Sequence, residues 1–365
     1  GTEEHLWSSN YDSRLDDIFA IQTDVASKVA ASLSAGLFFS SRAVRKDTDD
    51  VEAYTLYLRA MQLSYDFTEA ALRETVALLQ RAVAKDPEFA RAYAALADAW
   101  HGLGVSGYED FTSMTRKAEA DATKALALDP RLAETHAAMA GVHSMMDRFD
   151  QALAETEAAI GINPNLSEAY MSLGILDCIV RTARDGLESF KRAYELDPLS
   201  PGSGEVLASL ATWVGEDQLA LDVLARMREF HAKDPRVYLH IADHYMEKGD
   251  FVEAQKALDT ARSLSPDEPT VAPSQALLFA RAGRRREAED LLEREVLAKE
   301  NQSLRLNGTL WVRAALGDLD EAFEVLMKEA ETHSWPAFVR VDPLYAGMRK
   351  DPRYLEFCRR VGIPP

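Results

Sequence analysis

Two histidines four residues apart form the first pattern in this chain that could do chemistry. His240 and His244 would share one face of a helix, as two ligands of a zinc ion do. In the helical motif of zinc proteases, a glutamate follows the first histidine and acts as the general base, but Ile241 stands there. No third ligand is evident. We therefore predict ordinary surface or groove histidines and no metal site.

Other catalytic signatures are also missing. Cys178 has neither a nearby histidine nor a flanking glycine turn that would activate a thiol nucleophile, so we expect it to be inert. The sequence contains no glycine-rich phosphate-binding loop and no Gly-x-Ser-x-Gly elbow. The prediction is a chain without catalytic activity and without a cofactor.

Four arginines form one basic group, which falls at a turn between two expected helices: Arg281, Arg284, Arg285 and Arg286. Two interpretations remain open. The group is either a solvated turn or a docking site for an acidic segment or a phosphate.

The overall composition excludes several classes of function. The chain has 365 residues, of which 47% are hydrophobic and 28% charged, so it can bury a core. The net charge of −19 opposes binding to nucleic acids and to anionic membrane surfaces. No apolar run approaches the roughly 18 residues of a membrane-spanning helix. The two cysteines lie far apart, which is typical of a reducing compartment, and we expect a cytoplasmic protein.

A 34-residue period runs through the middle of the chain and predicts the elements that must position all these residues. Between Ala133 and Ser200 the pattern occurs twice without an insertion. Equivalent positions of the two copies lie 34 residues apart, among them His136 and Tyr170, Thr156 and Phe190, Pro164 and Pro198. Such a period is typical of a stacked solenoid, in which each unit packs only on its neighbours.

Each unit reads as two amphipathic helices. Tyr238, Ile241, Ala242 and Tyr245 follow the i, i+3, i+4, i+7 pattern of one helix face. Gly249 is placed to end that helix in a left-handed conformation, before a second apolar stripe begins.

These residues resemble the consensus of the tetratricopeptide (TPR) repeat at its aromatic, Leu-Gly/Ala, Tyr, Ala, Phe, Ala and Pro positions. The resemblance implies an all-α, right-handed TPR superhelix of about eight helix pairs, from about Val51 to about His333. One pair carries an insertion, from Gly104 to Met114. We predict three parts: an amino-terminal stub (1–50), the TPR array (51–333) and a carboxyl-terminal cap (334–365).

The first fifty residues do not follow the period. Glu4 to Tyr11 reads as a strand and Asp17 to Leu37 as a helix. Together they resemble the junction in bacterial multidomain signalling proteins where a TolB-like α/β domain leads into TPRs. In such proteins an adenylate cyclase domain, a winged-helix domain or a kinase often lies upstream. The resemblance implies that this chain is the carboxyl-terminal part of a longer protein, and its stub could support a homodimer.

The residues expected on the concave face form a strip with many apolar members, typical of a surface that binds a peptide or a helix of a partner. Alternatively, the chain's own first helix or a tight superhelix covers the strip. The residues are Asp98, His101, Met145, Met171, Ile175, Cys178, Ile179, Trp213, Leu239, Asp243, Met246 and Leu277.

Two functional hypotheses follow. The first is a noncatalytic scaffold that binds a protein or peptide through its concave groove. The second is the regulatory carboxyl-terminal region of a bacterial adenylate cyclase or transcriptional regulator, which acts on its own upstream domain.

Overall fold

The structure, a computed structural model, describes residues 47–63, 68–105, 108–266, 268–297 and 302–365. The strand and the helix expected before residue 50 fall outside these residues. Within the described part every regular element is helical, as the 34-residue period predicts.

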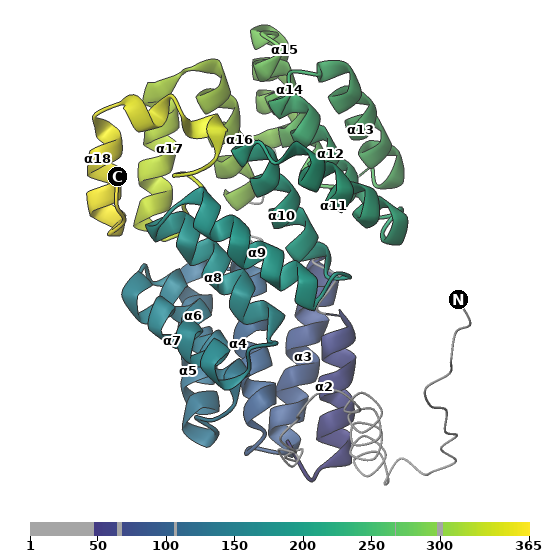
Figure 1. The fold of residues 1–365 in the computed structure, drawn as a ribbon, viewed down its shortest axis with the longest axis vertical. Helices are drawn as coiled ribbons and strands as arrows, with labels where there is room; N and C mark the ends of the chain where they lie inside the picture. Colours follow the sequence, from purple (N-terminus) through teal and green to yellow (C-terminus); the bar gives the residue numbers. More distant parts are fainter. Residues whose placement is uncertain (1–46, 64–67, 106–107, 267, 298–301) are drawn as a thin grey trace.

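Eight consecutive helix pairs make up the array (Figure 1), and the two helices of each pair pack against each other. The pairs are α2 (Val51–Leu63) with α3 (Glu69–Lys85), α4 (Ala90–Val105) with α5 (Phe111–Leu128), α6 (Ala133–Met145) with α7 (Phe149–Ile162), α8 (Ser167–Val180) with α9 (Ala183–Leu196), α10 (Pro201–Val214) with α11 (Asp217–Phe230), α12 (Pro235–Glu247) with α13 (Phe251–Leu264), α14 (Val271–Arg281) with α15 (Arg285–Leu291), and α16 (Gln302–Leu316) with α17 (Leu319–Glu331). A π-helical turn, η2 (Leu292–Val296), extends α15.

Glycines in the left-handed conformation separate the two helices of the later pairs. Gly215, Gly249, Gly283 and Gly317 recur every 34 residues and have φ between 74° and 83°. Glycine accepts positive φ without the steric cost of a Cβ, so it can reverse the chain tightly at the end of the first helix. The prediction for Gly249 is confirmed.

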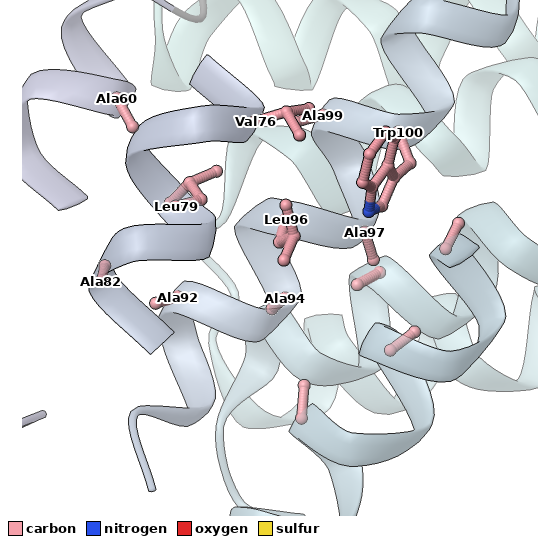
Figure 2. Packing of buried hydrophobic residues seen from close by; sticks show 14 of the residues in the cluster. Ala60, Val76, Leu79, Ala82, Ala92, Ala94, Leu96, Ala97, Ala99 and Trp100 are labelled. Atoms are coloured by element: carbon pink, nitrogen blue, oxygen red, sulfur yellow. The ribbon is translucent and has the colours of Figure 1, made fainter. Parts of the chain in front are cut away.

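Small residues let neighbouring helices approach closely. Ala92, Ala94 and Ala97 of α4 are buried beside larger apolar side chains such as Leu79 and Trp100 (Figure 2). A Cβ added to Gly174 of α8 would lie 2.8 Å from the ring of Phe190 in α9, so only glycine fits between these two helices. The core therefore runs along the array between the pairs, as in other stacked repeats.

The superhelix curves until its end meets its middle. After α17 the chain forms two 3₁₀ turns, η3 (Pro343–Tyr345) and η4 (Met348–Lys350), and the last helix α18 (Arg353–Val361). Phe357 of α18 packs in one apolar cluster with Phe323 and Leu326 of α17. The same apolar cluster also contains Phe149 of α7 and Ile179 of α8. In Figure 1 the yellow carboxyl-terminal segment lies close to α8, from which it is remote in sequence.

Candidate interaction groove

Half of the residues predicted to line an open groove are buried. Met145, Cys178, Ile179, Leu239, Met246 and Leu277 are at most 7% exposed. His101, Met171, Ile175, Trp213 and Asp243 are half-buried, and Asp98 is exposed. The expectation of a solvent-exposed apolar strip is therefore wrong for the six buried residues.

Two different neighbours cover these side chains. Met145 belongs to the cluster formed with Trp100 and Leu103 of α4, so the tight stacking of adjacent pairs buries it. Ile179, by contrast, packs in a cluster with Trp335 and Val339 of the carboxyl-terminal segment. The sequence left open that a tight superhelix covers the apolar strip. It did not indicate that the carboxyl-terminal segment covers part of it.

We define the groove segment as residues 335–344, which lie against the inner side of the array. Phe338 sits between two aromatic rings: its ring centroid lies 6.4 Å from that of Phe190 and 5.7 Å from that of Trp213. These separations and tilted geometries are those of favourable aromatic pairs.

Arg340 joins the groove segment to the end of a helix. Its Nη1 donates hydrogen bonds to the carbonyl oxygens of Ile179 (2.6 Å) and Arg181 (3.1 Å), at the carboxyl end of α8. Carbonyl groups at a helix end lack intrahelical donors and carry partial negative charge. A guanidinium there supplies hydrogen-bond donors and a compensating positive charge.

Trp335 anchors the start of the groove segment. Its indole packs edge-on against Phe149 and Phe357, with centroids 6.1 Å and 5.6 Å away. The indole Nε1 donates a hydrogen bond to Oδ1 of Asp147, at 3.2 Å. This residue thus connects α7, α18 and the turn before α7.

Arg349, which follows the groove segment, holds the end of that segment in place. Nη1 of Arg349 donates to the carbonyl oxygens of Val339 and Asp342, both at 2.8 Å. Tyr345, which follows, is 2% exposed. The segment therefore has one fixed conformation rather than the freedom of a chain end.

The two histidines contact hydroxyl groups of α10. Nδ1 of His240 lies 3.3 Å from the hydroxyl of Ser209, and Nδ1 of His244 lies 2.8 Å from that of Thr212. Burial disfavours the charged form of His240, but the neighbouring Glu205 carboxylate outweighs burial and raises its pKa. Among the described residues no group of three potential ligands could hold a metal ion.

Cys178 has the environment of an inert thiol. It is fully buried. Desolvation, followed by the negative charge of Asp177, raises its pKa to about 12. A thiol that stays protonated at neutral pH is a poor nucleophile.

Carboxylates neutralise most of the basic group. Arg281 pairs with Glu247 at 2.5 Å, Arg284 pairs with Glu287, and Arg285 pairs with Asp318 at 2.9 Å. Arg286 is exposed. This arrangement favours the solvated turn over a docking site, and anion binding here stays a prediction.

Comparisons with known proteins point to one repeat family. The family model described as "Tetratricopeptide repeat" matches residues 215–278. "Putative adenylate cyclase 3" of Rhizobium meliloti (strain 1021) is 31% identical over 161 residues, which are 41% of this chain and 26% of that protein. The chain thus matches about a quarter of the length of this relative.

The comparison with solved structures includes two matches that span most of this chain. The hetero-tetramer Cut9-Hcn1 of APC/C has a TM-score of 0.57 at 13% identity, over 93% of this chain and 60% of that one. Yeast Tom70 has a TM-score of 0.47 at 19% identity, over 96% of this chain and 78% of that one.

None of the described helices is both long and apolar enough to cross a membrane. Eight stacked helix pairs, left-handed glycines every 34 residues and the matching family model lead to one conclusion about the family. The chain is a tetratricopeptide-repeat protein.

Proposed function

We propose that this chain is a noncatalytic scaffold that binds a peptide of a partner protein in its concave groove, in place of its own groove segment. One observation carries the proposal. The groove already holds a stretch of turns, residues 335–344, by contacts that a separate peptide can also make. These contacts are aromatic packing around Phe338 and hydrogen bonds from Arg340 to helix-end carbonyls.

The contacts indicate what such a peptide would carry. An aromatic residue would fill the space between Phe190 and Trp213, and an arginine two positions later would reach the end of α8. The net charge of −19 also favours a basic partner segment, because complementary charge speeds association and selects partners.

The experiment measures binding of a fluorescent peptide with the sequence of residues 333–346 to the full chain. Wild type should bind it weakly, because its groove is occupied. The Phe338→Ala, Arg340→Ala double variant should bind at least ten times more tightly, because its own segment competes less well. Leu355→Ala, at an exposed position on α18, is the matched control and should behave as wild type.

A peptide in which the positions of Phe338 and Arg340 carry alanine tests specificity and should lose binding. If the double variant keeps its helicity and still binds the natural peptide no better than wild type, the groove segment is a fixed part of the fold and the proposal is wrong.

A second candidate function rests on the adenylate cyclase relative. The match of 31% identity supports a role as the regulatory part of a larger signalling enzyme, with an upstream domain as the groove's partner. Expression of the natural gene product and measurement of its cyclase activity, with and without the double substitution, tests this. Unchanged activity, or no activity, would speak against it.

A further inference from the structure

A cavity beside the groove segment carries an unbalanced set of charges. It has a volume of about 90 Å³ and is partly open to solvent. It is lined by α10, α12, α14, α16 and the end of the groove segment: Ser209, Trp213, Asp243, Met246, Glu247, Ser274, Leu277, Arg281, Trp311, Asp342 and Leu344. Three of these residues are acidic and one is basic.

The single cation of the cavity wall is already engaged. Nη2 of Arg281 lies 2.5 Å from Oε1 of Glu247. Asp243 and Asp342 then face the cavity without a paired cation of their own. Oδ1 of Asp342 accepts one hydrogen bond, at 2.8 Å, from the backbone N–H of Leu344. Asp243 has only longer-range attraction from His240 and Arg281.

Desolvation raises the pKa of both aspartates. Burial, more than any neighbour, raises the pKa of Asp342 to about 7 and also raises the pKa of Asp243. Asp243 is half-buried and lines the cavity. Carboxylates that are removed from water in this way gain stability from a bound cation.

The rest of the lining fits one kind of cation. Two indoles, of Trp213 and Trp311, suit a cationic head because their rings attract positive charge. Met246, Leu277 and Leu344 provide apolar surface for a short alkyl stem. The hydroxyls of Ser209 and Ser274 add acceptors for an ammonium group, which has three donors.

We infer that this cavity is a binding site for a primary alkylammonium group, held between the carboxylates of Asp243 and Asp342 and beside the indoles of Trp213 and Trp311. The volume fits an ammonium with the first carbons of its alkyl chain, since a cavity of about 150 Å³ holds a benzene molecule, and the rest of a longer chain extends through the side that is open to solvent. The source of the group is a small free amine or a lysine side chain of a partner. The inference does not depend on peptide binding in trans, because it needs only the groove segment in its present place.

The test is titration of the full chain with n-butylammonium chloride, followed by calorimetry and tryptophan fluorescence, against 1-butanol as a neutral probe of equal length. Butylammonium should bind saturably and at least ten times more tightly than butanol. Asp243→Asn should lower its affinity at least ten-fold. Asp222→Asn, an exposed aspartate on α11, is the matched control and should leave the affinity unchanged.

Asp342→Asn is the second variant, because asparagine keeps an acceptor for the Leu344 N–H while it removes the charge. Equal affinities for butylammonium and butanol, or unchanged binding in both folded aspartate variants, would overturn the inference. Nα-acetyl-lysine amide distinguishes the sources: tighter binding than butylammonium indicates a partner's lysine, and weaker binding indicates a small free amine.

Discussion

His333 and Asp147 are 186 residues apart in the chain, and Nδ1 of His333 lies 2.5 Å from Oδ2 of Asp147. They are also the two non-glycine residues with positive φ in the described part of the chain, 55° and 53°. Asp147 stands two repeat lengths before Gly215, at the position where the later pairs have a left-handed glycine. An aspartate at this turn costs backbone energy, but its carboxylate contacts both His333 and Trp335.

Replacement of Asp147 separates the cost of its backbone conformation from the stability that its side-chain hydrogen bonds contribute. Asp147→Gly relieves the left-handed backbone but removes both hydrogen bonds to the carboxyl-terminal segment. We expect a net loss of about 1–3 kcal/mol in the free energy of unfolding, because the Trp335 N–H loses its partner inside the protein. Asp147→Asn should lose less, because asparagine tolerates positive φ and retains an acceptor oxygen. Urea unfolding measures both variants, and a glycine variant as stable as wild type would show that the contact contributes no more than the backbone strain costs.

Two glycine substitutions, with opposite expected effects on the stability of the fold, test the repeat geometry. Gly249→Ala places a Cβ at φ 74°, and although the site is open, the backbone conformation should cost about 1 kcal/mol or more. Gly141→Ala lies inside α6, also in open space, and should stabilise by about 0.5–1 kcal/mol, because alanine favours the helix. Thermal unfolding of both variants provides the comparison. Equal shifts would contradict the assignment of a left-handed turn to Gly249.

Glu329 predicts a pH dependence of stability. This carboxyl on α17 is 1% exposed, its Oε2 has no hydrogen-bond partner, and burial raises its pKa to about 8. A raised pKa means that the folded state holds the proton more tightly than the unfolded state. The resulting stability is fully present below 4.5, the ordinary pKa of a glutamate side chain, and is lost as pH rises through about 8.

Comparison of wild type with Glu329→Gln isolates this contribution. The glutamine variant should become relatively more stable as pH rises. The difference in unfolding free energy between the two proteins should change by a few kcal/mol from pH 4.5 to 8, because each pKa unit corresponds to about 1.4 kcal/mol. Parallel stability curves over this range would show that the pKa of Glu329 does not differ between the folded and unfolded states.

The two proposals are linked through the groove segment, because Asp342 and Leu344 belong both to this segment and to the cavity wall. A bound ammonium should therefore stabilise the segment in its place and weaken binding of a peptide of residues 333–341, which lacks Asp342 and Leu344. Peptide titrations with and without saturating butylammonium measure this coupling. Tighter peptide binding in its presence would contradict it.

The helix pairs and the turns between them follow from the amino-acid pattern alone. The spacing of Tyr238, Ile241, Ala242 and Tyr245 marks one helix face, and Gly249 marks its end, because both are consequences of local backbone geometry. Eight pairs and the all-α superhelix are the result of this repetition.

What covers the concave face depends on the arrangement of the pairs in space. The curvature of a solenoid is the sum of small rotations between neighbouring pairs, and a 34-residue period does not specify their size. These rotations bring Trp335, Phe338 and Arg340 onto α7, α8 and α10, although nothing in the local pattern of these residues indicates a distant partner. For this reason Ile179 and Leu277, which the repeat pattern places on the groove side, are buried in the folded protein.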